Sequence, residues 1–220
     1  MKFTVEREVL DLGLKVIGIL ITNVDNKTQD EFFLTFKDKA YKALKQKYQD
    51  FDIETDMILK GFHELHKKSN VKRRKNTPIS ENILKRFLKE EKMPDTNKLI
   101  SIYNIVTLDS RLSIGMHDID KISGNVNLKI AGADEKYTSI TGEIKTLNQN
   151  QYVYTDKKNI IFKLEVYQNP KTFVTETTKN IFITVQGNEA TSAEYLMEVA
   201  SEIIHLITTY CGGNAQIIYK

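Results

Sequence analysis

The hydrophobic pattern of this chain changes its period near Gly124, and that change limits the folds open to it. Between the two opening strands and this glycine, apolar residues recur at helical spacing, as they do from Leu99 to Val106. After it, from Val126 to Ile130, apolar and polar residues alternate, as in a half-buried strand. Helices therefore gather in the N-terminal half and strands in the C-terminal half. This order predicts an α+β fold with strand-rich core sheets flanked by helices.

Capping and turn residues give approximate bounds to the elements. Thr28 with Glu31, and Thr191 with Glu194, form capping boxes that predict the starts of two helices. The predicted helices begin after Thr28, near Glu54, at Thr77–Pro78, at Asn97 and after Thr191, and the last one ends at Gly212–Gly213. The predicted strands are Lys2–Leu10, Leu14–Thr22, Gly124–Ala131, Gln151–Thr155, Ile160–Tyr167, Asn180–Gln186 and Ile217–Tyr219.

The length of 220 residues fits one compact domain. We expect N-terminal strands and helices over 1–76 and a core over 77–220, with the opening strands joining the later sheet. The net charge of +3 is too balanced to indicate nucleic-acid binding by itself. The most apolar stretch, Val16 to Ile21, is too short to span a bilayer, and the first residues lack a signal-peptide pattern. We therefore expect a cytoplasmic protein without membrane contact, and the oligomeric state is open.

The cysteine and histidine pattern does not predict a metal site. Cys211 is the only cysteine, and it reads as a passive thiol. His63 and His66 lie three apart on a predicted helix but lack an evident third ligand. His205 is expected to be exposed. We predict no metal and no cofactor.

A basic run covers Lys67 to Lys75, with six Lys or Arg in nine positions. One interpretation is a solvated loop. The other is contact with the phosphate backbone of tRNA through Lys72, Arg73, Arg74 and Lys75, which would depend on salt.

The most specific pattern lies between Leu99 and Ile122, where a helical stretch leads into Asp118-Ile-Asp-Lys121 and then into a strand. It resembles the tRNA-editing domain of the beta subunit of phenylalanyl-tRNA synthetase, whose pattern reads roughly TNYVMLELGQPLHAFDLDK. It is still more similar to the freestanding bacterial relatives of that domain. Asn104 falls on the asparagine of this pattern, and Asp118, Asp120 and Lys121 fall on its D-x-D-K.

Other pieces of the resemblance follow in the same order. Tyr152–Asp156 resembles the strand end of the family, and Lys171–Val185 looks like its T-x-x-T-E-T-T stretch before a strand. The last helix ends in Tyr-Cys-Gly-Gly, which also fits. The resemblance covers about Pro78 to Gly213 and is weaker before that.

This resemblance implies the editing-domain fold and a pocket for the aminoacyl end of a mischarged tRNA. The pocket would be lined by Tyr103 and Asn104 from the helix and by Gly115 and Glu165 from the sheet. Asn104 would orient the substrate, since an amide supplies both donors and an acceptor. Ester hydrolysis also needs a placed water and donors for the developing oxyanion.

One position departs from the family pattern. When the family's P-L-H-A-F-D motif is aligned without gaps on the D-x-D-K, the histidine of the motif falls on Gly115. His117, two residues later, is a candidate for activating water. The alternative is an exposed or capping histidine beside Asp118. Asp118 and Asp120 are expected to brace the turn into the strand.

The sequence thus predicts a protein that binds aminoacyl-tRNA and hydrolyses mischarged tRNA in trans. Two alternatives stay open: an inactive domain that binds an amino acid or another small ligand, and an RNA- or protein-binding module without chemistry. Synthesis of aminoacyl-tRNA is not expected, because no nucleotide-binding signature is found.

Overall fold

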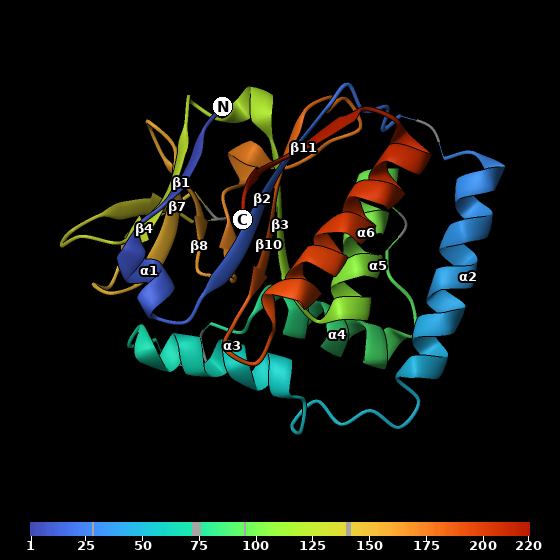
Figure 1. Cartoon of the computed structure of the whole chain (residues 1–220), viewed down its shortest axis with the longest axis horizontal. Coiled ribbons are helices and arrows are strands. Elements are labelled where there is room, and N and C mark those ends of the chain that lie inside the picture. Colours follow the sequence, from blue (N-terminus) through green and yellow to red (C-terminus); the bar gives the residue numbers. More distant parts are fainter. Residues whose placement is uncertain (28, 72–75, 95, 140–141) are drawn as a thin grey trace.

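Two β-sheets lie face to face, and helices cover the outer face of one of them (Figure 1). The computed structural model describes residues 1–27, 29–71, 76–94, 96–139 and 142–220. This arrangement is the α+β fold that the change in hydrophobic period predicts.

The sheet beneath the helices has four strands in the order β11-β2-β10-β3, and all neighbours are antiparallel. Its strands are β2 (Lys15–Thr22), β3 (Ser113–Asp118), β10 (Ile181–Gly187) and β11 (Asn214–Tyr219). β2 is covered on both faces, as its continuous apolar run predicts. β3 is fully buried and was not predicted as a strand.

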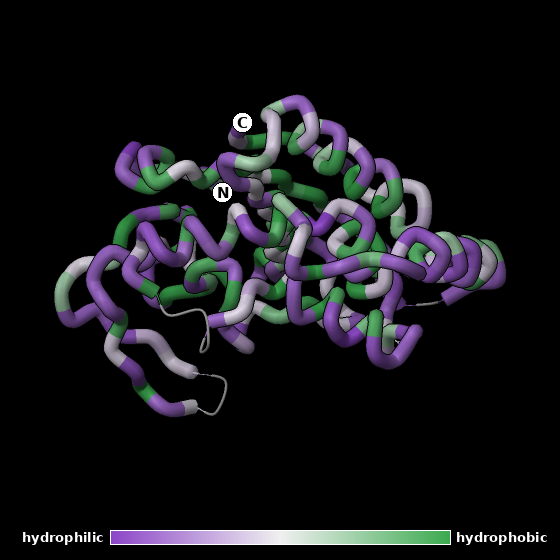
Figure 2. The backbone as a smooth tube through the Cα atoms, turned by 90° about the horizontal axis from the view of Figure 1, so that it is seen from below, coloured by the Kyte–Doolittle hydropathy of each residue, from purple (hydrophilic) through white to green (hydrophobic). Residues whose placement is uncertain are grey.

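The second sheet has five strands in the order β1-β4-β7-β8-β9. They are β1 (Phe3–Val5), β4 (Val126–Ile130), β7 (Tyr152–Thr155), β8 (Ile160–Lys163) and β9 (Tyr167–Gln168). β1 pairs in parallel with β4, so the opening strand does join the later sheet. A hairpin of β5 (Lys136–Thr138) and β6 (Ile144–Thr146) extends away from the body of the molecule (Figures 1 and 2).

The helices are α1 (Arg7–Asp11), α2 (Glu31–Lys47), α3 (Met57–Lys68), α4 (Ile79–Glu90), α5 (Lys98–Ser110) and α6 (Ala193–Cys211). α5 and α6 pack on the four-stranded sheet, and α2 and α4 flank α5. No helix in the described ranges is long and apolar enough to cross a membrane.

Alternation along β10 divides the interior into two layers. Ile183 and Val185 point toward α5 and α6 and belong to one apolar core. Phe182, which precedes Ile183 and has the opposite orientation in the strand, points toward the five-stranded sheet and belongs to the core between the sheets. A third apolar cluster lies under α2, α4 and α5.

Two predicted helix caps differ from those observed. Ser192, not Thr191, caps α6 and accepts a hydrogen bond from the backbone N–H of Tyr195 at 3.0 Å. Thr191 instead donates its hydroxyl to the carbonyl oxygen of Asn188 at 2.8 Å. Asp30 caps α2, while Thr28 lies outside the described residues.

Two predicted strands are shorter than expected. The first ends at Val5, and Arg7–Asp11 forms a short helix in place of its second half. The predicted strand Ile160–Tyr167 is interrupted at Leu164, whose φ of +51° is incompatible with an extended strand. Pairing therefore stops after β8 and resumes in β9.

Candidate functional site

The path from α5 into β3 is set by two local signals. Asn97 caps α5 by accepting a hydrogen bond from the backbone N–H of Ile100 at 3.0 Å. Arg111 ends the helix in the left-handed conformation, with φ +60°. The chain then returns as β3, which has β10 as its only strand neighbour in the described sheet. One edge of β3 is therefore open to other groups.

A small hollow lies at this edge of β3. It has a volume of about 230 Å³, and its lining comes from α5, β3, β9 and the segment after β9: Ile100, Tyr103, Met116, Gln168, Phe173 and Val174. Pockets for drug-sized ligands span about 300 to 1,000 Å³. The hollow therefore suits a group of the size of one side chain.

The hollow combines apolar walls with a few neutral polar groups. Gln168 donates from its amide to the carbonyl oxygen of Met116 at 2.6 Å, which covers part of the open strand edge. Burial raises the pKa of Tyr103, so its hydroxyl is neutral at ordinary pH. Phe173 is 41% exposed and is an unusually accessible aromatic ring at this site. Such a lining favours an apolar or aromatic group whose polar atoms meet neutral partners.

His117 lies behind the hollow and is completely buried. Its Nδ1 is 2.8 Å from the hydroxyl of Thr172 and 3.3 Å from the amide nitrogen of Gln168. Its ring contacts those of Phe162 and Phe182. Burial lowers the pKa of His117 to about 3, so the imidazole is neutral. The alternative of an exposed or capping histidine is therefore wrong.

Gly115 faces the space between the two sheets. A Cβ atom at this position would lie 2.6 Å from the hydroxyl oxygen of Thr184 and 3.2 Å from the ring of Phe162. These two side chains fill the space that a larger residue would need. A histidine at position 115, as in the family pattern, would have to displace them.

Glu165 forms a buried polar cluster that was not predicted. It is completely buried, pairs with His66 of α3 and accepts a hydrogen bond from the Tyr152 hydroxyl. Burial is the largest single effect and lowers the pKa of His66, but the Glu165 carboxylate, the Asn76 backbone and Glu81 together outweigh burial and raise it. The imidazolium and the carboxylate therefore form an ion pair that joins α3 to the end of β8.

A second pair adjoins this cluster. Glu81 of α4 is completely buried, and its two carboxylate oxygens lie 2.5 Å from His63 and 2.5 Å from Lys85. Within the described ranges, no group of three or more His, Cys, Asp and Glu side chains could hold a metal ion. Each histidine of α3 thus has its own carboxylate.

The structure brings only part of the predicted site together. Tyr103 lines the hollow, whereas Asn104 is buried on α5 without lining it. Gly115 and Glu165 lie between the sheets, across β3 from the hollow. The predicted tRNA contacts Lys72, Arg73, Arg74 and Lys75 lie outside the described residues.

Other expectations about single residues are confirmed. Asp118 accepts hydrogen bonds from the backbone N–H of Asp120 at 3.0 Å and from the Thr178 hydroxyl at 2.8 Å, so it does brace the turn. His205 is exposed. Burial raises the pKa of the Cys211 thiol to about 11, as suits a passive thiol.

Sequence reasoning predicted Tyr103 but missed the other five lining residues of the hollow, which are Ile100, Met116, Gln168, Phe173 and Val174. Phe173 and Val174 belong to the Lys171–Val185 stretch, which resembles the family but has no spacing that points to a pocket. Gln168 is a lone polar residue in a short edge strand, and no sequence signal singles it out.

Comparison with known proteins agrees with this architecture. The sequence profile of the B3/4 domain matches residues 66–212. The beta subunit of phenylalanine–tRNA ligase from Mycoplasma genitalium is 29% identical over 102 residues, which are 46% of this chain and 13% of that one. The same subunit from Mycoplasmoides gallisepticum is 30% identical over 114 residues, which are 52% of this chain and 14% of that one. The chain thus corresponds to a small part of these relatives.

A solved structure is similar in fold. The N-terminal fragment of the phenylalanyl-tRNA synthetase beta subunit from Pyrococcus horikoshii superposes with a TM-score of 0.53 and 16% sequence identity. The superposition covers 97% of this chain and 50% of that fragment. At this identity the similarity concerns the fold alone.

Proposed function

The chain belongs to the B3/4 domain family, and from that premise we propose that its α5–β3 hollow binds the aminoacyl end of a tRNA. The observation that carries the proposal is the size and lining of the hollow. A volume of about 230 Å³ suits the side chain of one amino acid. Tyr103 and Phe173 supply aromatic walls, and Gln168 supplies an amide beside the main chain of β3.

The second part of the proposal is hydrolysis of a mischarged tRNA in trans. In this reaction water attacks the ester carbonyl, and the products are the free amino acid and the tRNA. His117 is a poor general base, because its pKa is about 3 and its ring is enclosed by Phe162 and Phe182. Water at this site would therefore be held by amide and main-chain groups, and a modest rate is expected.

The body of the tRNA would contact the basic run. Lys72, Arg73 and Arg74 are the proposed phosphate contacts, because Lys and Arg neutralise the backbone and release counterions. Neutralising these three residues should weaken tRNA binding and reduce its dependence on salt. Unchanged affinity at low salt would contradict this assignment.

The test is the release of amino acid from a panel of correctly and wrongly charged tRNAs, with wild-type protein and the variants Gln168→Ala and Asn104→Ala. We expect selective release of one amino acid, and a loss of about tenfold or more in Gln168→Ala. Gln216→Ala, which changes an exposed residue of β11, is the matched control. Asn104→Ala tests whether the buried amide beside the hollow takes part in the release of amino acid.

A binding measurement separates the two parts of the proposal. The probe is a set of 3′-aminoacylamino-adenosines, in which an amide replaces the ester so that hydrolysis is blocked. If the probes bind to wild type but not to Gln168→Ala, and no amino acid is released from any tRNA, the hollow is a binding site and the protein is not a hydrolase. If the folded protein neither binds the probes nor releases amino acid from any tRNA, both parts of the proposal are wrong.

A further inference from the structure

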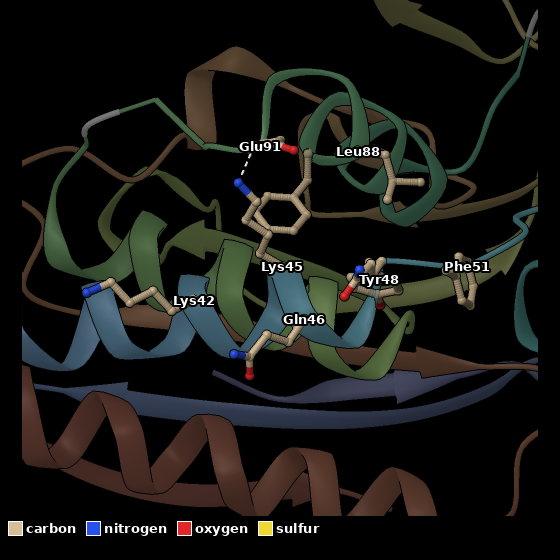
Figure 3. A pocket seen from close by; sticks show the side chains of 9 residues that line it. Lys42, Lys45, Gln46, Tyr48, Phe51, Leu88 and Glu91 are labelled. Atoms are coloured by element: carbon tan, nitrogen blue, oxygen red, sulfur yellow. Dashed lines mark hydrogen bonds and ion pairs between the residues drawn. The ribbon is translucent and has the colours of Figure 1, made fainter.

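A long groove runs between α2 and α4 and shares no lining residue with the α5–β3 hollow. It consists of two adjoining hollows of about 750 and 430 Å³, which have Lys42, Lys45 and Glu91 in common. Figure 3 shows the larger one, with Lys45 reaching from α2 across to Glu91 at the end of α4. Its size exceeds that of the proposed aminoacyl site.

The floor of the α2–α4 groove is apolar, and its aromatic side chains already contact other groups of the protein. Phe87 and Tyr48 are buried there, and the Tyr48 hydroxyl donates to the carbonyl oxygen of Leu108 in α5. The rings of Tyr48 and Phe51 meet edge to face at 4.9 Å, and Tyr41 stacks on Phe87 at 6.1 Å. These contacts occupy ring faces that an RNA base would need for stacking. Aliphatic side chains can still pack against the floor.

The rim of the groove is mostly positive. Its charged residues are four lysines and two carboxylates: Lys37, Lys42, Lys45, Lys92, Asp38 and Glu91. The Lys45–Glu91 ion pair is exposed on both sides, so water and salt weaken it and an incoming carboxylate can compete for the lysine. An apolar floor with a basic rim complements a helix that has one apolar face and acidic flanks.

We infer that the α2–α4 groove binds an acidic amphipathic helix of another protein. The lining residues of α2 extend from Lys37 to Gln46, which at 1.5 Å per residue corresponds to about 14 Å, or roughly two and a half helical turns. The partner helix would present apolar residues at i, i+3, i+4 and i+7 to the floor, as in other helix-in-groove complexes. Its Asp and Glu side chains would face Lys42, Lys45 and Lys92. This would recruit a protein partner, separately from any tRNA chemistry.

The experiment is selection from a phage-displayed library of random 16-residue peptides on the full chain, with counter-selection on the variant Lys42→Glu. We expect enrichment of peptides with apolar residues at helical spacing and an excess of Asp and Glu. No enrichment, or enriched peptides without acidic residues, would overturn the inference.

The enriched peptide is then synthesised, labelled and titrated by fluorescence polarisation. Lys42→Glu should weaken its binding about tenfold or more, whereas Lys39→Glu on the same helix should not, because Lys39 is exposed and lines neither hollow. Leu88→Gln should also weaken peptide binding, because it removes an apolar contact at the floor of the groove. Leu34→Gln, which changes a leucine outside the groove, is its control. Unfolding curves that match wild type establish that each variant is folded. Equal effects of the variants and their controls would contradict the assignment.

A single-stranded RNA 12-mer is the competing probe. If it binds more tightly than the peptide and loses affinity in Lys42→Glu but not in Lys39→Glu, the groove is a nucleic-acid surface and the inference is wrong. Deacylation by Lys42→Glu is expected to equal that of wild type, so failure here leaves the proposed function untouched.

Discussion

At the scale of single residues, Gly115 shows how tightly the layer between the sheets is filled. A Cβ atom there would approach the Thr184 hydroxyl oxygen to 2.6 Å, which is closer than non-bonded atoms allow. Overpacking of this kind usually costs about 1 to 3 kcal/mol. We predict that Gly115→Ala lowers the free energy of unfolding by about this amount, measured by urea denaturation.

A double-mutant cycle identifies the cause of this loss. Thr184→Ala removes the clashing atom, so Gly115→Ala should cost less in the Thr184→Ala background than in wild type. Residues in contact show such coupling, whereas independent sites add. Additive costs would contradict the contact between positions 115 and 184.

The ion pair of His66 and Glu165 predicts a dependence of stability on pH. The folded state raises the pKa of His66 above its usual value of about 6.5, because Glu165, the Asn76 backbone and Glu81 together outweigh the effect of burial. The folded protein therefore holds this proton more tightly than the unfolded chain. The stabilisation is fully present below pH about 6.5 and is lost as pH rises through the folded pKa.

The variant His66→Gln tests this prediction. Removing one partner of a buried pair costs about 3 to 5 kcal/mol, so the variant should be much less stable at pH 6. As the pH rises above about 6.5, the difference in the free energy of unfolding between wild type and variant should narrow. His205→Gln, which changes an exposed histidine, is the control. Urea unfolding curves whose difference is the same at all pH values would rule out the raised pKa.

At the scale of elements, sequence patterns predicted the amphipathic parts of the fold well. β4 alternates in burial, and α6 presents its apolar residues to the sheet, as their periods indicate. The exact caps were harder to predict, because Thr191 and Ser192 are neighbours that can both cap a helix. Only the tertiary contact of Thr191 with Asn188 decides between them.

β3 could not be recognised from its own residues. Its sequence SIGMHD is buried on both faces, between the five-stranded sheet and the helices, where a continuous apolar run is the usual signal. Ser113, Gly115 and His117 interrupt such a run. The interruption at Leu164 is equally invisible, since a leucine with positive φ has no sequence signal. The hollow depends on both features, because β3 forms one wall and β9, after the interruption, carries Gln168.

The candidate site likewise depends on contacts between segments that lie far apart in the sequence. The resemblance singled out Tyr103, His117 and Glu165 as residues, but it could not place them on opposite sides of β3. Their partners come from distant segments: Gln168 for His117, and His66 for Glu165. Long-range pairing of this kind is a property of the folded chain and is not encoded in local spacing.

At the scale of the whole molecule, the N-terminal third contributes strands to both sheets. β1 pairs with β4, and β2 lies between β10 and β11 in the middle of the four-stranded sheet. His66 of α3 reaches Glu165 at the end of β8. Residues 1–76 therefore complete the core of residues 77–220 and are expected to fold together with it.

This interleaving predicts that the chain unfolds as one unit and that residues 77–220 do not fold alone. Without β2, β10 and β11 lose the strand that joins them, and the apolar residues of both cores become exposed. The full chain should show coincident urea transitions by fluorescence and circular dichroism. The fragment 77–220 should lack a cooperative transition, and adding the fragment 1–76 should restore it. A cooperative transition of 77–220 by itself would instead indicate two domains, and the N-terminal strands would then be an addition to an independent core.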